Sequence, residues 1–215
     1  MKSAYAIGIA GPSCAGKTVL ARRLATMVPA SIVPLDAYYR DLSHLPHEQR
    51  AKQNFDRPDA LDGDLIVQHM AELLAGNTIE LPVYDFATHA RTGGVERVEP
   101  SDYIIIEGLF TLHWEALRRL LGTSVYVELD DTKCLDRRKQ RDVRERGRTV
   151  HSVETQWCET ARPMAEVFVL PTRQYADLVV SGCDRLERSA ERVLAHMQSK
   201  RTIPLSDANN ADDTC

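Results

Sequence analysis

Hydrophobic residues follow two alternating patterns along this chain. Short β-branched apolar runs without helical spacing predict buried strands. These runs cover Ala4–Ala10, Ser31–Leu35, Tyr103–Ile106, Ser124–Leu129 and Ala176–Val180. Between them, apolar residues recur every three or four positions, which predicts amphipathic helices. The predicted helices cover Lys17–Met27, Leu61–Ala75, Trp114–Leu121, Thr132–Glu145, Val153–Val169 and Leu186–Ser199.

The order of these elements predicts an α/β fold. Strands that alternate with helices form parallel sheets with right-handed crossovers, so we expect a parallel sheet covered by helices. Gly76, Gly122 and Gly147 follow three of the helices, where a glycine often caps the C-terminus. Residues 1–200 fit a single domain, and the polar, acidic residues 201–215 are expected to form a flexible tail.

Composition narrows the class of protein. Of the 215 residues, 43% are hydrophobic and 27% charged, as in ordinary globular proteins, and the net charge of −4 argues against a general nucleic-acid binder. The apolar N-terminal run is too short for a secretory signal or a membrane span, which needs about 20 residues. Five scattered cysteines without a CxxC pair indicate neither a disulfide framework nor a zinc site, so we expect a cytoplasmic protein.

The segment GPSCAGKT lies between the first predicted strand and helix and matches the phosphate-loop pattern GxxxxGK[ST]. Its glycines let backbone N–H groups turn inward, Lys17 can neutralise phosphates, and Thr18 offers a hydroxyl to magnesium. The predicted phosphate-binding residues are Gly11, Pro12, Ser13, Cys14, Ala15, Gly16, Lys17 and Thr18. The alternative is a plain glycine-rich turn. Cys14 is either a tolerated small residue or a redox-sensitive thiol.

Two carboxylates follow apolar strands. Glu107 lies in IIIEG, directly after three isoleucines, and Asp36 lies in PLDAYYRD directly after the second strand. Ligands of open α/β sheets bind at the carboxyl edge, so Glu107 is a candidate magnesium partner. Asp36 can accept a proton from an attacking hydroxyl, which favours phosphoryl transfer over hydrolysis. From spacing alone, Glu107 can also be a merely exposed residue, and Asp36 a helix cap or turn residue.

A basic segment, RRKQRDVRERGR, spans residues 137–148 of this acidic protein. On a helix, one face would carry Arg138, Arg141 and Glu145, and several guanidiniums would converge. A second face would carry Arg137, Arg141, Arg144 and Arg148. Such a lid could neutralise charge on a transferred phosphoryl group and exclude water. The alternatives are a nucleic-acid patch, or a solvated helix face in which Asp142 and Glu145 pair with arginines.

Several separated motifs together resemble one family. They are GPSCAGKT, LDAYYRD, NFDRPDALD, LPVYDFATHAR, IIIEG, RRKQRDVRERGR, QWCETARP and LPTRQYAD. From Ile7 to about Val180, the chain resembles the uridine-cytidine kinases of pyrimidine salvage. The resemblance implies a P-loop kinase core with a hairpin-like substrate flap and an arginine-rich lid at about residues 137–150. It also implies a nucleoside as the small-molecule substrate, ATP or GTP as donor, Mg²⁺, and a homo-oligomer, often a tetramer, without a nucleic-acid or membrane partner.

The resemblance assigns roles to individual residues. Asp36 would be the general base on the ribose 5′-hydroxyl, Lys17 and Arg141 would contact the phosphates, and Thr18 and Glu107 would hold magnesium. The remaining substrate contacts would be Asp56, Tyr84, Phe86, His89, Arg138, Arg146 and Gln156.

Elementary chemistry supports the substrate contacts. A carboxylate such as Asp56 can accept two hydrogen bonds from a vicinal diol, so a deoxyribose would fit less well. Tyr84 and Phe86 share one side of a strand and can stack on a flat base. Neutral His89 has one donor and one acceptor, which tautomers exchange, so uracil and cytosine could both fit. Each aromatic residue taken alone could instead pack in the core, and His89 could lie on the surface.

The chain departs from the family pattern in places. It reads SGCD at residues 181–184, where the family usually has Pro-Arg-Gly-Gly, Ala15 where serine is usual, and Trp157 where tyrosine is common. Two other functions stay open: a kinase of another small hydroxyl substrate, such as phosphoribulokinase, and a nucleotide-binding switch without catalysis. A guanine-reading NKxD sequence is absent, and a switch would not need Asp36 together with Asp56.

Overall fold

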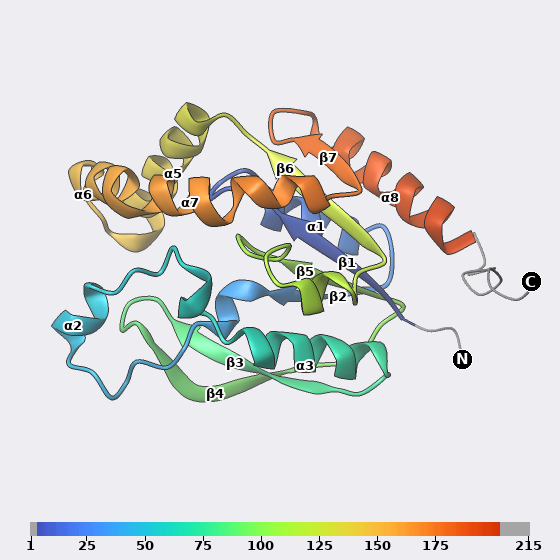
Figure 1. The fold of residues 1–215 in the computed structure, drawn as a ribbon, viewed down its shortest axis with the longest axis horizontal. Coiled ribbons are helices and arrows are strands. Elements are labelled where there is room, and N and C mark those ends of the chain that lie inside the picture. The colour runs from blue at the N-terminus through green and yellow to red at the C-terminus, as the bar shows by residue number, and fades with distance from the viewer. Residues whose placement is uncertain (1–3, 203–215) are drawn as a thin grey trace, which may run out of the picture.

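A parallel five-stranded sheet forms the centre of the protein (Figure 1). The structure is a computed structural model and describes residues 4–202. Along the sheet the strand order is β2-β5-β1-β6-β7, and all neighbouring strands pair in parallel. The strands are β1 (Tyr5–Ala10), β2 (Ala30–Pro34), β5 (Tyr103–Glu107), β6 (Thr123–Glu128) and β7 (Leu178–Ser181). The α/β fold and all five strands predicted from the apolar runs are therefore confirmed.

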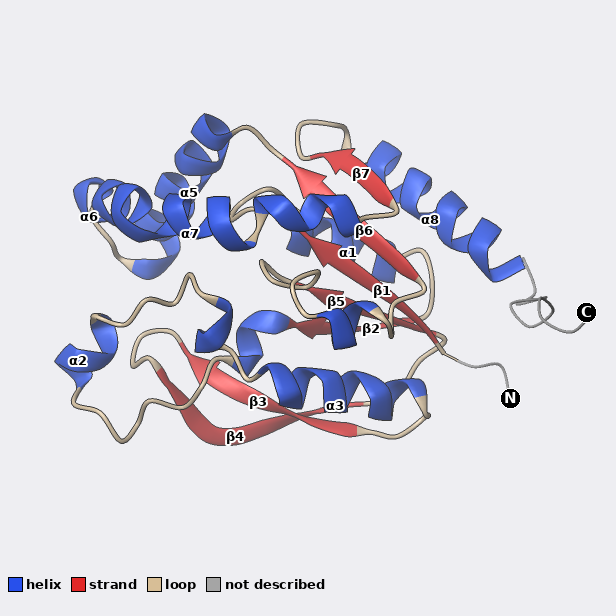
Figure 2. Ribbon diagram, viewed as in Figure 1, coloured by secondary structure: helices blue, strands red, loops and turns tan. Residues whose placement is uncertain are grey.

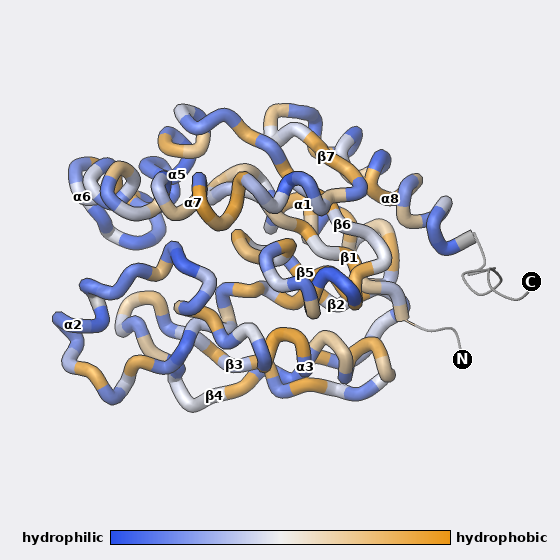
Figure 3. The backbone as a smooth tube through the Cα atoms, viewed as in Figure 1, coloured by the Kyte–Doolittle hydropathy of each residue, from blue (hydrophilic) through white to orange (hydrophobic). Residues whose placement is uncertain are grey.

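Helices cover both faces of this sheet. On one face, α1 (Lys17–Ala25) and α8 (Leu186–Thr202) pack against Ile7, Ile9 and Ile105. On the other face, α3 (Gly63–Leu74) and α4 (Glu115–Arg118) pack against Ile104 and its neighbours. Ile104 and Ile105 of β5 pack on opposite faces of the sheet because side chains alternate along a strand. The central strands are accordingly among the hydrophobic parts of the chain (Figure 3).

An antiparallel hairpin lies apart from the main sheet, below it in Figure 2. It consists of β3 (Ile79–Asp85) and β4 (Ala90–Val98), with a register shift between Pro82 and Tyr84. The hydrophobic pattern did not reveal these strands because β4 is polar and mostly exposed. The resemblance predicted a hairpin-like flap, which is confirmed. Arg91 of β4 connects the hairpin to the segment that follows β2. Its Nε donates a hydrogen bond to the carbonyl oxygen of Tyr39 at 3.0 Å.

The arginine-rich segment lies on α5 (Asp131–Arg146), the first of three consecutive helices. Gly147 ends α5 with a φ of 62°, as its predicted capping role requires. Next come α6 (Val150–Gln156), a π-helical turn (Trp157–Ala161) and α7 (Arg162–Phe168). The predicted single helix Val153–Val169 therefore begins earlier and contains a π turn, a feature frequently found at functional sites.

Other boundaries also differ from the prediction. The helix expected at Trp114–Leu121 ends at Arg118, and Gly122 is not its cap, because its N–H bonds to the carbonyl of Ala6 at 2.9 Å. Gly76 does follow α3 with a φ of 88°. A short helix, α2 (His47–Ala51), was not predicted. Of the predicted tail, residues 201–202 belong to α8 and the rest lies outside the described residues. No helix within residues 4–202 is long and apolar enough to span a membrane.

Candidate active site

The phosphate loop joins β1 to α1 and has the backbone that the sequence predicts. Gly11 has a φ of 141°, and a Cβ there would lie 2.3 Å from the carbonyl oxygen of Val127. Gly16, with a φ of 111°, precedes the first residue of α1. The first turn of α1 carries no acidic side chain, so its N–H groups remain open to an anion. The loop is therefore built from backbone to hold phosphate.

Lys17 is buried under this loop. Its side-chain Nζ donates to the carbonyl oxygen of Pro12 at 2.8 Å, and only 8% of the residue is exposed. Burial lowers the pKa of Lys17, while the carboxylates of Glu107 and Asp36 act in the opposite direction. An anionic ligand would stabilise the charged ammonium further, so Lys17 and bound phosphates would favour one another.

The two predicted carboxylates lie at the carboxyl edge beside the loop. Glu107 ends β5 and accepts a hydrogen bond on Oε1 from Thr18 Oγ1 at 2.9 Å. Burial raises the pKa of Glu107, Lys17 lowers it, and Asp36 raises it again. Asp36 is exposed, in a 3₁₀ turn that directly follows β2. Asp36, Lys17 and Glu107 lie near enough to shift one another's ionisation, so the fold places them in one site.

Hydroxyl and carboxylate oxygens of this kind suit Mg²⁺. Within residues 4–202, no group of three or more His, Cys, Asp or Glu side chains could hold a metal by itself. Mg²⁺ usually takes only one or two protein carboxylates, together with substrate phosphates and water. Thr18 and Glu107, next to the phosphate loop, fit such an ion.

The three residues predicted to contact a base lie together in an aromatic cluster. The ring centroids of Tyr84 and Phe86 are 5.2 Å apart, and His89 stacks on Phe55 at 4.8 Å with 14° between the planes. Tyr39 joins the cluster 5.1 Å from Tyr84. The sequence analysis missed Tyr39 and Phe55, although both lie in quoted motifs, three residues after Asp36 and one residue before Asp56.

The exposure of Phe86 and the ionisation of His89 suit this cluster to ligand binding. Phe86 is 42% exposed, which is unusual for a large apolar side chain in a packed cluster. His89 has a φ of 51° in the hairpin turn. Burial and the neighbouring His47 lower its pKa below the ordinary value, which favours the neutral imidazole with one donor and one acceptor.

Asp56 connects the loop before α3 to the lid. Its Oδ1 lies 4.0 Å from Arg138 Nη1, and its Oδ2 accepts a hydrogen bond from Thr160 Oγ1 at 3.3 Å. Arg138 also donates from Nη2 to Gln156 Oε1 at 3.1 Å. Burial raises the pKa of Asp56, while Arg138 and then Thr160 lower it. Three predicted substrate residues, Asp56, Arg138 and Gln156, are thus brought together.

The lid arginines that converge in the structure are not the sets predicted from the faces of a helix. Those that gather around the buried carboxylate of Asp142 belong to Arg138, Arg141, Arg146 and Arg148. Arg137 instead donates to the carbonyl oxygens of Cys14 and Gly182, and Arg144 pairs with Glu145. Helix periodicity alone could not show this, because Arg148 returns to Asp142 only through the backbone turn at Gly147.

The segment that departs from the family pattern lies against the phosphate loop. A Cβ on Gly182 would be 2.2 Å from the carbonyl oxygen of Ala15, so only glycine fits there. Arg137 bridges both sides, with distances of 3.3 Å to the oxygen of Cys14 and 3.0 Å to that of Gly182. This segment therefore supports the flank of the loop despite its different sequence.

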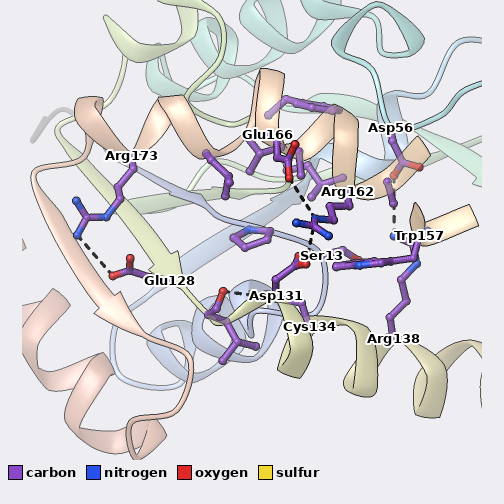
Figure 4. A pocket seen from close by; sticks show the side chains of 18 of the residues that line it. Ser13, Asp56, Glu128, Asp131, Cys134, Arg138, Trp157, Arg162, Glu166 and Arg173 are labelled. Atoms are coloured by element: carbon purple, nitrogen blue, oxygen red, sulfur yellow. Dashed lines mark hydrogen bonds and ion pairs between the residues drawn. The ribbon is translucent and has the colours of Figure 1, made fainter. Parts of the chain in front are cut away.

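A cavity of about 420 Å³ lies between the phosphate loop, the π turn and α7 (Figure 4). Pro12 and Ser13 of the phosphate loop line it together with Asp56 and Arg138. In Figure 4, Asp56, Trp157 and Arg138 lie together on one side of the cavity. The guanidinium of Arg138 lies 5.8 Å from the ring centroid of Trp157. Two residues of the phosphate loop and two predicted substrate residues therefore border this space, whereas Asp36 and the aromatic cluster are not part of its lining.

The fold and this site define a P-loop kinase. Among solved structures, phosphoribulokinase from Rhodobacter spheroides is similar with a TM-score of 0.63 and 16% identity, covering 84% of this chain and 71% of that one. A putative fructose transport system kinase from Silicibacter gives a TM-score of 0.68 at 23% identity, covering 84% of this chain and 91% of that one. These similarities concern the fold.

Sequence comparison identifies the family. The model of the Phosphoribulokinase / Uridine kinase family matches residues 6–187, and the chain belongs to this family. It is 43% identical to the uridine kinase of Chloroflexus aurantiacus over 90% of this chain and 94% of that protein. It is 46% identical to the uridine kinase of Geobacillus kaustophilus, over 83% and 86% of the two chains.

Proposed function

We propose that this protein phosphorylates uridine and cytidine at the ribose 5′-hydroxyl, with a nucleoside triphosphate such as ATP as donor. The observation that carries the proposal is the pairing of a phosphate loop with an acceptor pocket. The proposed acceptor residues combine an exposed carboxylate, Asp36, with a partly buried one, Asp56, and with the aromatic cluster. The relatives named uridine kinase support the same activity.

The phosphoryl-transfer end of the site consists of Asp36, Lys17 and Arg141. Asp36 takes the proton from the attacking 5′-hydroxyl, for which an exposed carboxylate near the loop is suited. Lys17 and Arg141 neutralise charge on the transferred phosphoryl group. Thr18 and Glu107 would hold Mg²⁺, which supplies further neutralisation of the donor phosphates when bound.

The nucleoside end consists of the ribose and base contacts. Asp56 accepts hydrogen bonds from the ribose diol, and Arg138 and Gln156 contact the same end of the nucleoside. Tyr84 and Phe86 offer ring surface to the pyrimidine. His89, whose lowered pKa favours the neutral imidazole, faces its polar edge, and Arg146, whose guanidinium lies 5.2 Å from the ring centroid of Phe86, closes the pocket.

A sugar-phosphate kinase is the second candidate, because the family includes phosphoribulokinase and that enzyme shares the fold. Such a substrate has no flat ring. The exposed ring of Phe86 beside Tyr84 and the stacked His89 and Phe55 therefore favour the nucleoside. A homo-oligomeric state and a cytoplasmic location stay predictions from the sequence.

A coupled ADP-release assay with ATP and Mg²⁺ tests the proposal. Uridine, cytidine, 2′-deoxyuridine, adenosine and ribulose 5-phosphate are compared as acceptors, with chromatography to identify the monophosphate product. We expect turnover of uridine or cytidine and much slower turnover of 2′-deoxyuridine. Turnover of ribulose 5-phosphate alone would show that the acceptor pocket is misassigned, and turnover of none would exclude a kinase of these substrates.

A further inference from the structure

Asp142, on the inner face of α5, has no role in the proposed catalytic set, yet it is fully buried. Arg141 binds one carboxylate oxygen, Oδ1, through both Nε and Nη2 at 2.8 Å. Arg146 Nη1 lies 3.7 Å from the same oxygen. Arg138 Nε and Arg148 Nη1 each lie 3.6 Å from Oδ2. A single carboxylate therefore contacts four guanidiniums.

These guanidiniums lie at different parts of the proposed site. Arg138 lies 4.0 Å from Asp56, which is proposed to contact the ribose. Arg146 lies over the ring of Phe86, at the base end, and Arg148 donates to Gln156 Oε1. Arg141 is proposed to face the phosphoryl group. All four arginines contact the carboxylate of Asp142.

Three of these arginines have one side directed at the buried carboxylate of Asp142 and another side that is open to a ligand. The Asp142 side chain is 0% exposed, whereas those of Arg141, Arg146 and Arg148 are 31%, 36% and 28% exposed. Each guanidinium has five N–H donors in a planar fork, so those not directed at Asp142 can bind a ligand. One side of the cluster is thus occupied by a fixed carboxylate, and the other side is left for substrate.

The charges explain why the carboxylate is needed. Like charges held a few ångströms apart in a partly buried site repel strongly, and Asp142 lies between the four cations. Removing the central carboxylate would leave these cations uncompensated, which is costly for buried groups. The guanidiniums would then separate toward water, and the geometry of the lid would be lost.

We infer that Asp142 is a positioning residue, which fixes Arg141 for phosphoryl transfer and Arg138 and Arg146 for nucleoside binding. The inference rests on the proposed function, because it gives Asp142 its effect through residues with proposed substrate contacts. It goes beyond that function by assigning the alignment of the arginine lid to one buried carboxylate that touches neither substrate nor phosphate.

Steady-state kinetics of Asp142→Asn test the inference. Asp136→Asn is the matched control, because Asp136 is an exposed acid of the same helix, 3.8 Å from Lys139. For Asp142→Asn we expect kcat to fall about tenfold to a hundredfold, as for a misplaced catalytic group, and the KM for uridine to rise. Asp136→Asn should match the wild type. Wild-type kcat and KM in a folded Asp142→Asn protein would overturn the inference.

A double-variant comparison distinguishes positioning from a general structural role. If Asp142 acts on kcat through Arg141, the double variant Asp142→Asn/Arg141→Ala has the same kcat as Arg141→Ala. Independent effects would multiply instead and would overturn the inference. If Asp142→Asn does not fold, Asp142→Glu replaces it, because it keeps the charge and displaces the carboxylate by one methylene. We then expect a folded protein with reduced kcat, and unchanged kinetics would overturn the inference.

The failure of the proposed function would look different. If the wild type does not use uridine, the proposed function fails, and the same variants are measured with whichever acceptor the wild type phosphorylates. If uridine is turned over but Arg141→Ala keeps the wild-type kcat, the proposed activity stands and the positioning inference is overturned.

Discussion

The donor half and the acceptor half of this site are built in different ways. The donor half is a contiguous segment, residues 11–18, whose backbone N–H groups and buried Lys17 are proposed to bind the phosphates. The acceptor half takes side chains from the turn after β2, from the hairpin, from the segment around Asp56 and from the lid. Local backbone geometry therefore fixes the first half, and tertiary packing of distant side chains fixes the second.

This difference predicts different responses to substitution. Changes in the acceptor half should alter nucleoside turnover and leave donor binding intact, since no backbone of the phosphate loop moves. Substitution of a loop side chain with no proposed ligand contact should alter neither nucleoside turnover nor donor binding. The experiments below test this separation, beginning with the largest expected effect.

Asp36→Asn should have the largest effect. Loss of the proposed general base should lower kcat for uridine about 10²- to 10⁴-fold. Affinity for a non-hydrolysable ATP analogue should stay within a few fold, since Asp36 is not part of the loop. Asp59→Asn is the control, because it removes an exposed carboxylate that pairs with Arg57. Full turnover by Asp36→Asn would show that another group accepts the proton.

The affinity for uridine should depend on pH through Asp56. Because burial raises the pKa of its carboxyl, the ionised form that accepts hydrogen bonds is lost at a higher pH than the ordinary value of about 3.9. Calorimetric titration of uridine without nucleotide should show a Kd that rises as pH falls through this raised pKa. The same series with Asp56→Asn separates this effect from protonation of His89. A Kd in the wild type that is constant down to pH 4 would contradict the assignment.

Cys14→Ser should have the smallest effect. Cys14 has a φ of 62°, and the loop holds phosphate through backbone groups, so kcat and the KM for ATP should change less than about twofold. Peroxide treatment of the wild type provides the complementary measurement. Inactivation that Cys14→Ser resists would identify Cys14 as a redox-sensitive thiol and would show that a loop side chain matters.

The same difference explains what the sequence could predict. The strands, the phosphate loop, Thr18 and Glu107 depend on local periodicity and on a contiguous motif, and the structure brings them together as expected. Asp142 was seen only as a surface partner of arginines, because helix spacing does not reveal that α5 buries this face. Tyr39 and Phe55 were missed because nothing in the local sequence indicates that their rings contact the aromatic residues of the hairpin.

The π turn could not be predicted for a related reason. Apolar spacing describes a continuous helix through Val153–Val169 and does not reveal one extra residue in a turn. That turn includes Trp157 and Thr160, which contact Arg138 and Asp56. The resemblance to a family supplied the substrate roles that periodicity could not.

Parallel calorimetric titrations of Phe86→Ala test the central claim, that the aromatic cluster binds the base and is separate from the donor site. Phe86 is largely exposed, so its truncation should leave the core intact. Base stacking is worth about 1–3 kcal/mol, so the Kd for uridine should rise roughly tenfold while that for a non-hydrolysable ATP analogue stays unchanged. An unchanged Kd for uridine, or equal weakening of both ligands, would contradict this account.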